Sequence, residues 1–353
     1  MTRKAKSESI WRSRAERLGG VLPIGRFHPG VAAWAAKRRR SEVWCVAFSG
    51  GADSLALLLL LWAHWPERRD RLVALHFNHR LRGRESTRDE KFCRRVCAGL
   101  GIRLRVGQWM GAARTLRLTV GRKARPVASE AEARKARHGF FATELKKLHC
   151  RVLWLAHQQD DIAESMLMRL ARGSSAGGLA APRPVHQISR APTNVRPLLT
   201  LKKEELVAAL RAAGAAWRED ASNARDDHFR NRIRRNVLPG WVKAAGRDAL
   251  AGAALSRERL EEDELALEAW LDLLAPFDRT GRLDLAVLAG KPRAVTRRAL
   301  HRWLLALKSP PDLSRRGFEL LLAAIEQGQP TRFSLGTKGF ALIRRGQLTY
   351  QSA

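Results

Sequence analysis

The sequence has few cysteines and no long apolar run, and each shortage excludes a class of protein. Four cysteines occur in 353 residues, and no two of them form a Cys-x-x-Cys pair. We therefore expect no disulfide framework, zinc ribbon or iron–sulfur site. The longest apolar run, Leu55–Ala63, is shorter than the roughly 20 residues that cross a bilayer. Polar residues follow the N-terminal cations, so we expect no signal peptide, no membrane partner and a cytoplasmic location.

Acidic residues are also scarce. The 34 Asp and Glu residues face 66 Lys and Arg residues, which leaves a formal net charge of +32 at pH 7. Codon usage can favour Arg over Lys, but it explains this surplus of charge less well. The cations run through both halves of the chain. A polyanionic partner is therefore favoured, and nucleic acid is the first candidate.

From residue 42 to about 170, short apolar segments alternate with longer helical patterns. The segments predicted to be strands are 43–48, 72–77, 102–106 and 152–156. The predicted helices are 53–62, 86–100, 128–148 and 160–170. Strands that alternate with helices of this length indicate βαβ units. We therefore predict an α/β fold with a Rossmann-like parallel sheet and helices on both of its faces.

The rest of the chain divides around this pattern into three predicted parts. Residues 1–41 form a basic N-terminal extension, and residues 42–220 form the α/β domain. Gly, Ser, Ala and Pro dominate 173–197, which predicts a long loop inside that domain. Residues 221–353 have mainly helical patterns, and glycines separate short apolar segments near the end. We predict a mainly helical C-terminal domain that ends in a small hairpin.

A glycine-rich turn joins the first predicted strand to the first helix. It reads Ser49-Gly50-Gly51-Ala52-Asp53-Ser54. Glycines let backbone N–H groups approach a ligand, and the positive end of the following helix favours an anion. The whole string is therefore predicted to bind phosphate, although a bare Gly-Gly would indicate only a turn. No Gly-x-x-x-x-Gly-Lys-Ser/Thr string occurs, so the loop is not of the Walker type.

This loop resembles the pyrophosphate loop of the N-type ATP pyrophosphatases. Members of that superfamily adenylate an oxygen of their substrate, release pyrophosphate and let a nucleophile displace AMP. The loop alone does not distinguish the members of this superfamily. Further motifs between Val43 and Pro239 resemble, in the same order along the chain, those of the tRNA(Ile)-lysidine synthetase family. These motifs are His76-Phe77-Asn78-His79 with Leu81-Arg82, Glu130 with Ala133, Arg134 and Arg137, His157 with Asp160, Asp161 and Glu164, Arg172-Gly173 with Gly178-Leu179, Arg196-Pro197-Leu198-Leu199, Trp217 with Asp220 and Asn223, and Arg230-Asn231-Arg232-Ile233-Arg234 with Leu238-Pro239. The departures from the family pattern are His138, Gln158, Ser175 and Pro182.

The resemblance implies a reaction and its partners. ATP would adenylate the C2 oxygen of the wobble cytidine in tRNA(Ile) with a CAU anticodon, with Mg²⁺ as cofactor. The ε-amine of L-lysine would then attack C2, and the codon read would change from AUG to AUA. Residues 42–220 would be the catalytic domain and residues 221–353 the tRNA-binding domain. A homodimer would also fit the family.

The same resemblance implies residue roles. The residues expected to bind ATP are Ser49, Gly50, Gly51, Ala52, Asp53, Ser54 and His76. The residues expected to be catalytic are Asp53, Arg134, Asp160 and Glu164, and Asp53 would also hold Mg²⁺. The residues expected to bind lysine are Arg137, Asp160 and Glu164. The residues expected to bind tRNA are Arg230, Arg232, Arg234 and Arg235.

Spacing alone leaves simpler explanations open. Asp160 and Glu164 are four residues apart at a predicted helix start, so they share a face, with Asp161 about a quarter turn away. Acidic residues there often only complement the helix dipole. If they are functional, either lysine or Mg²⁺ would be their ligand. His76 could be an ordinary buried histidine, and the arginines of 230–235 could be a solvated face.

Two other functions also remain open. A thiolase of the same superfamily would need reactive cysteines at a suitable site or a Cys-x-x-Cys cluster, and the sequence offers neither. A non-catalytic RNA-binding protein could use the same fold, but the intact phosphate loop argues against it.

Overall fold

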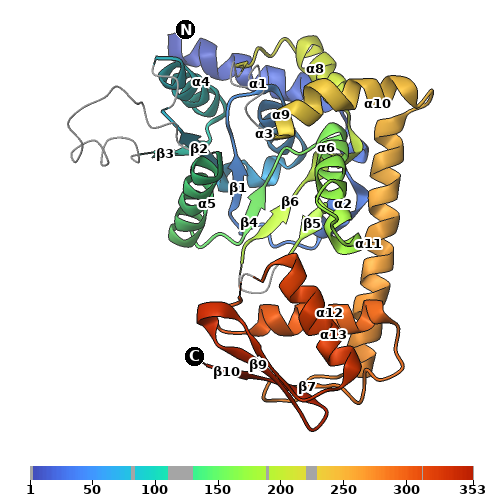
Figure 1. Cartoon of the computed structure of the whole chain (residues 1–353). Helices are drawn as coiled ribbons and strands as arrows, with labels where there is room; N and C mark the ends of the chain where they lie inside the picture. Colours follow the sequence, from blue (N-terminus) through green and yellow to red (C-terminus); the bar gives the residue numbers. More distant parts are fainter. Residues whose placement is uncertain are drawn as a thin grey trace, which may run out of the picture. The chain divides into compact units, whose positions relative to one another are not determined.

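The computed structural model describes residues 3–80, 84–109, 130–187, 191–219, 229–311 and 313–352. The chain forms two compact units, Met1–Arg259 and Leu260–Ala353, coloured along the sequence in Figure 1. All of the residues predicted to form the functional site belong to the first unit. Within the described ranges, no helix combines the length and the apolar character that crossing a membrane requires.

A six-stranded sheet forms the centre of the first unit (Figure 1). Its strand order is β3–β2–β1–β4–β6–β5, parallel from β3 to β6 with an antiparallel edge strand β5. The strands are β1 (Trp44–Ala47), β2 (Leu72–Asn78), β3 (Arg103–Gln108), β4 (Val152–Trp154), β5 (Val185–His186) and β6 (Thr193–Val195). This confirms the predicted parallel sheet. The order reverses between β1 and β4, and ligands of open α/β sheets bind at the carboxyl ends of strands beside such a switch point.

Helices enclose this sheet because their apolar faces must be buried against it or against one another. The helices of the first unit are α1 (Arg3–Val21), α2 (Pro29–Ala36), α3 (Ala52–His64), α4 (Arg84–Leu100), α5 (Glu130–Lys147), α6 (Gln159–Leu170), α7 (Ala176–Leu179), α8 (Lys203–Ala212), α9 (Phe229–Arg232) and α10 (Leu238–Ala244). The shorter turns are η1 (Ile24–Arg26), η2 (Pro66–Arg71), η4 (Pro197–Thr200) and the π-helical turn η6 (Ile233–Val237). Every residue from Leu55 to Leu61 is buried, so α3 is the central helix of the core.

The N-terminal segment is part of this core. Trp11, Ala15, Leu18 and Leu22 recur at helical spacing and are buried, and α1 packs against α3 and α4. Residues 1–41 are therefore not a separate basic extension as predicted; their many cations obscure this apolar stripe in the sequence.

The second unit contains more sheet than the sequence predicted. An antiparallel sheet has the order β7–β10–β9–β8 and carries the helices α12 (Arg293–Ala306) and α13 (Arg315–Gln327). The strands are β7 (Leu283–Asp284), β8 (Thr331–Ser334), β9 (Phe340–Arg344) and β10 (Gln347–Gln351), with the turn η7 (Gly336–Lys338) between β8 and β9. The prediction of a mainly helical domain with a small hairpin is corrected to helices plus a four-stranded sheet. The two-residue strand β7 pairs with a segment about sixty residues later, so no local pattern reveals it.

The border between the units also differs from the predicted border at 220–221. The helix α11 (Ala249–Leu274) begins in the first unit and ends in the second. Leu238 and Ala253 share a small apolar cluster with Ile162 and Leu199. Residues 229–259 therefore belong to the α/β unit, because their apolar side chains are buried against α6 and η4.

Candidate active site

The phosphate loop lies at the carboxyl end of β1 and leads directly into α3. The Ser54 hydroxyl donates to the Gly51 carbonyl at 3.0 Å and accepts from the Ser49 backbone N–H at 3.2 Å. The two serine hydroxyls are 3.0 Å apart. Gly51 precedes the helix without a side-chain cap, so the first N–H groups of α3 remain available to an anionic ligand.

Gly50 is the position of this loop that requires glycine. Its φ of +93° lies in the region that side chains rarely adopt. A Cβ at this position would lie 3.1 Å from Cys93 Sγ and 3.3 Å from Phe92 Cδ1. The Gly50 carbonyl also accepts a hydrogen bond from the Arg218 backbone N–H at 3.0 Å. Contacts from α4 and from residue 218 therefore fix the loop from two sides.

Asp53 is a partly buried carboxylate in the first turn of α3. Burial, together with the nearby Asp161 and Asp160, raises the pKa of Asp53 to about 6, although Lys203 and Arg234 oppose the shift. Its Oδ1 atom is buried and has no hydrogen-bond partner among the described residues. A cation would satisfy that oxygen, so this carboxylate fits a role in holding a metal ion.

His76 ends up beside the same loop, at the carboxyl end of β2. Its Nδ1 lies 2.9 Å from the Phe48 carbonyl oxygen, which can only accept, so Nδ1 carries the proton. Burial lowers the pKa of His76, and the ring is therefore neutral. Its Nε2 is a buried acceptor without a partner among the described residues.

The helix α6 begins with a reciprocal cap that orients its acidic residues. The Gln158 side chain accepts from the Asp160 N–H at 2.6 Å, and Asp161 Oδ2 accepts from the Gln158 N–H at 3.0 Å. Gln158 departs from the family pattern, yet it is only 1% exposed and caps the helix. Asp160 instead accepts the Lys203 backbone N–H at 3.0 Å.

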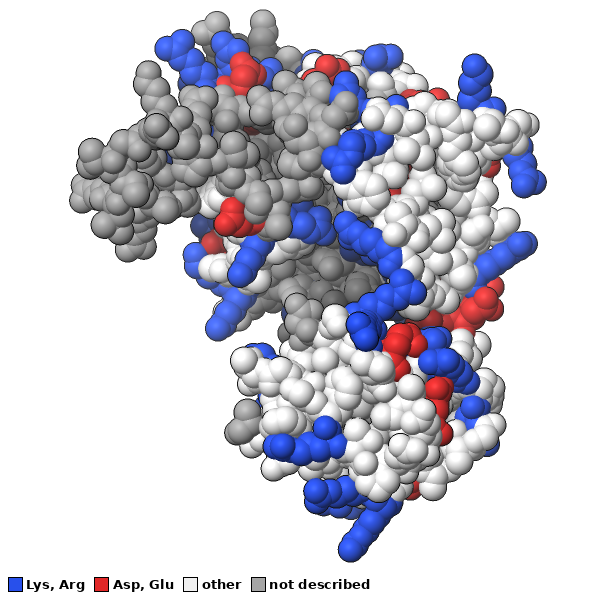
Figure 2. Space-filling view, viewed as in Figure 1, with Lys and Arg blue, Asp and Glu red and all other residues white. Residues whose placement is uncertain are grey.

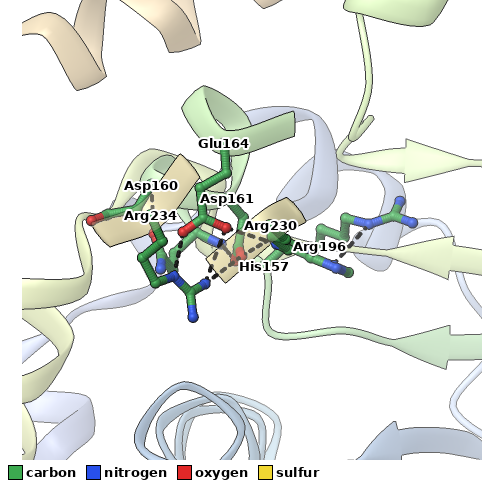
Figure 3. A network of polar contacts seen from close by, with 8 residues as sticks. His157, Asp160, Asp161, Glu164, Arg196, Arg230 and Arg234 are labelled. Atoms are coloured by element: carbon green, nitrogen blue, oxygen red, sulfur yellow. Dashed lines mark hydrogen bonds and ion pairs between the residues drawn. The ribbon is translucent and has the colours of Figure 1, made fainter. Parts of the chain in front are cut away.

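Glu164 lies at the centre of an ion cluster (Figure 3). It is fully buried, and its oxygens accept Arg230 Nε at 2.7 Å, Arg234 Nη2 at 3.1 Å and Arg234 Nε. Arg230 Nη2 also donates to Asp161 Oδ1 at 2.6 Å. Glu164 therefore shares its arginines with Asp161, three residues away, whereas the spacing had suggested Asp160 as its functional neighbour.

A histidine and one more arginine, His157 and Arg196, extend this cluster. Arg196 Nε donates to His157 Nδ1 at 3.2 Å, which leaves the ring proton on Nε2. Burial lowers the pKa of His157 well below its usual value, and Arg196, Arg230, Arg134 and Arg137 act in the same direction. The two arginines predicted on α5, Arg134 and Arg137, are therefore close enough to act on this histidine.

The structure thus brings most of the predicted site residues together, but it divides the four arginines predicted to bind tRNA into two pairs. Arg230 and Arg234 face the acidic residues of α6, whereas Arg232 and Arg235 are exposed. Asp161, His157 and Arg196 belong to the motifs that resemble the family, but no role was predicted for them. Those motifs and the three-residue spacing of Asp161 and Glu164 are the signals that indicate them. The motif positions outside the described residues are Leu81, Arg82, Asp220, Asn223 and the nearby cation Arg225.

The loop, the sheet and the switch point define a PP-loop protein. A family model of the PP-loop domain matches residues 30–241, which is more than half of the chain. Among solved structures, the U34-tRNA thiolase NcsA from Methanococcus maripaludis is similar, with a TM-score of 0.52 and 14% sequence identity. The match covers 72% of this chain and 80% of that chain. At this identity the similarity concerns the fold alone.

The sequence comparisons narrow this class. A model of the TilS substrate binding domain matches residues 283–349. The tRNA(Ile)-lysidine synthase of Bacillus subtilis is 33% identical over 289 residues, which cover 82% of this chain and 57% of that protein. The enzyme of that name from Geobacter sulfurreducens is 36% identical over 283 residues, 78% of this chain and 56% of its own length. The chain belongs to the TilS family, and it spans a little over half the length of these relatives.

Proposed function

We propose that this chain ligates L-lysine to C2 of the wobble cytidine of tRNA(Ile) with a CAU anticodon. The C2 oxygen attacks the α-phosphorus of ATP, and pyrophosphate leaves as its P–O bond breaks. The lysine ε-nitrogen then attacks C2 and loses a proton, and AMP leaves with the electrons of the C2–O bond. One difficult substitution becomes two easier ones, as in covalent catalysis.

The proposal rests on the close placement of the phosphate loop and the ion cluster around Glu164. The phosphate loop follows β1 and the ion cluster follows β4, and these neighbouring strands flank the switch point. Asp53 of the loop lies close enough to Asp160, Asp161 and Arg234 for their charges to act on its carboxylate. The loop and the cluster are therefore one site, in a chain whose relatives carry the name tRNA(Ile)-lysidine synthase.

The nucleotide is assigned to the loop and to His76. The uncapped N–H groups at the start of α3, together with the Ser49 hydroxyl, supply donors for phosphate oxygens, while the Ser54 hydroxyl donates to the Gly51 carbonyl and holds the loop. The buried Nε2 of His76 would accept from an amino or hydroxyl group of the nucleotide. Such a contact would replace the hydrogen bond that this nitrogen lacks.

Asp53 is assigned to Mg²⁺. Among the described residues no three His, Cys, Asp or Glu side chains are grouped to hold a metal ion. Mg²⁺ at nucleotide sites commonly uses one or two carboxylates and completes its shell with phosphate and water. A bound Mg²⁺ would neutralise charge on the phosphates of ATP. By holding that metal ion, the Asp53 carboxylate would help to orient the phosphates.

The substrate amine is assigned to Asp160. Glu164, the other predicted lysine ligand, is already surrounded by two guanidinium groups. Asp160 lines a cavity of about 240 Å³ together with the aliphatic side chains of Val242 and Leu250. A carboxylate beside aliphatic groups suits a lysine side chain, which has a cationic end and an apolar stem. Arg134 and Arg137 of α5 are assigned to neutralising a phosphate or the lysine carboxylate.

The tRNA is assigned to exposed cations. On the face drawn in Figure 2, Lys and Arg side chains are spread over both units. Of the four arginines predicted to bind tRNA, Arg232 and Arg235 are exposed and are assigned to phosphate contacts. Arg230 and Arg234 are assigned to the reaction site, because the acidic residues of α6 hold them there.

Pyrophosphate release tests the proposal. Release over many turnovers should require ATP, L-lysine and the tRNA(Ile) transcript together, because without lysine the reaction stops at the adenylated tRNA, and lysine should become attached to the tRNA. Asp53→Asn should abolish release and spare tRNA binding, whereas Asp160→Asn should raise the lysine concentration needed and leave the ATP requirement unchanged. Release without lysine but with a sulfur donor would favour a thiolase instead. Cys97→Ala is the control, because burial raises the pKa of this α4 thiol and the proposed reaction does not use it.

A further inference from the structure

The helix α10 and the residue before it, Val237, expose three large apolar side chains. Val237 is 42% exposed, Trp241 is 36% exposed and Val242 is 37% exposed. Of the residues in α10, only Leu238 is buried. Large aromatic side chains seldom lie on a protein surface without a reason, and grouped apolar exposure indicates an interaction site.

The surroundings of Trp241 leave its side chain accessible. Its neighbours toward the end of the helix are Ala244 and Ala245, which are too small to cover an indole ring. A Cβ added to Gly240 or to Gly246 would meet no atom within 4 Å. The surface beside the tryptophan is therefore open on both sides along the chain.

The exposed charges that flank Trp241 along the chain have one sign. Arg235, Lys243 and Arg247 are exposed, and residues 235–247 contain no acidic residue. The first acidic residue after them, Asp248, is held by Lys202 Nζ at 2.6 Å. An exposed aromatic ring among cations is the combination that binds unpaired nucleotides, since bases stack on the ring and phosphates contact the cations.

We propose that Trp241 is a stacking platform for an unpaired base of the bound RNA. The inference rests on the proposed function in that the RNA is taken to be tRNA. A second copy of this chain is the less favoured occupant, because α10 has seven residues and stable interfaces bury about 800 Å² on each partner. Two copies would also bring like charges together, given the net charge of +32.

The test compares tRNA affinities at one fixed salt concentration, measured by filter binding without ATP or lysine. Trp241→Leu keeps an apolar side chain but loses the ring, and should weaken binding by roughly 5- to 150-fold. Trp241→Phe keeps a stacking surface and should bind within about 3-fold of the wild type. At saturating tRNA, the rate of pyrophosphate release by Trp241→Leu should equal that of the wild type.

Trp270 provides a matched control, because it is 37% exposed but lies between Glu268 and Asp272 on α11. Trp270→Leu should leave tRNA affinity unchanged. Equal affinities of Trp241→Leu and the wild type would overturn the proposal, as would equal weakening by Leu and Phe. Unchanged affinity with a lower sedimentation mass for Trp241→Leu would assign the surface to a second copy. Failure of the proposed function would appear separately, as absent lysine-dependent pyrophosphate release by the wild type.

Discussion

Glu164 is the residue whose replacement should reveal most about this site. Glu164→Gln keeps the volume but exchanges one carboxylate oxygen for an NH₂ group, which then faces the N–H groups of Arg230 or Arg234. Breaking a buried ion pair in this way costs about 3 to 5 kcal/mol. The arginine side chains are each 29% exposed, so we expect the lower end of that range, about 3 kcal/mol.

Thermal unfolding followed by circular dichroism measures this cost. For a unit of this size, 1 kcal/mol shifts Tm by about 2 to 4 °C, so Glu164→Gln should lower Tm by roughly 6 to 12 °C. Asp70→Asn is the control, since the Asp70–Arg71 pair is exposed and such pairs contribute about 1 kcal/mol or less. A Tm for Glu164→Gln no lower than that of the control would refute the argument from burial.

A triple variant separates stability from chemistry. Replacing a buried ion cluster with apolar residues of similar volume is often neutral or stabilising. Glu164→Leu with Arg230→Met and Arg234→Met should therefore regain part of the lost Tm but not all of it, because Asp161 Oδ1 loses its bond from Arg230 while Oδ2 keeps the bond from the Gln158 N–H. Pyrophosphate release should remain absent if the cluster acts in the reaction. An active triple variant would show that the cluster is only structural.

Three further predictions follow from single features of the site. Gly50→Ala should greatly weaken ATP binding measured by calorimetry, because φ is +93° and Cys93 blocks the Cβ, whereas Gly51→Ala, with φ of −72°, should bind ATP within a few-fold of the wild type. Burial raises the pKa of Cys97 to about 12, so the protonated thiol should resist iodoacetamide at pH 8, and fast labelling of the folded protein would contradict this. Arg232→Ala should lower the salt slope of tRNA binding by about one unit, and an unchanged slope would remove Arg232 from the interface.

The sequence predicted the parts of the site that depend on local order. The apolar segment before Ser49 and the helix after it had to place the loop at the carboxyl end of a strand. The same alternation placed Asp160 and Glu164 at the start of a helix after the strand that became β4. In the structure β1 and β4 are neighbours, so the two locally predicted features lie close together.

The sequence could not predict contacts between distant segments. Glu164 and Arg230 are 66 residues apart, and nothing in the spacing of the arginines indicates which of them face an acidic residue. Helical spacing placed Arg230 and Arg234 on one side of their segment, but a chain with 66 cations offers many such pairs. The apolar stripe of α1 and the strand β7 were missed for the same reason, since each is defined by what it packs or pairs with.

Because acidic residues are scarce in this chain, the buried ones are important for fixing the positions of individual arginines. In a chain with 66 Lys and Arg residues and 34 Asp and Glu residues, carboxylates are too few to pair one to one with every cation, and exposed arginines lose little by remaining mobile. Glu164 and Asp161 hold Arg230 and Arg234 in one geometry, and a guanidinium that is paired on one side still has N–H groups to donate on another. Donors fixed in advance stabilise developing negative charge without reorganising during the reaction. The buried acidic residues of α6 are therefore best understood as the supports that turn two of many arginines into positioned groups beside the phosphate loop.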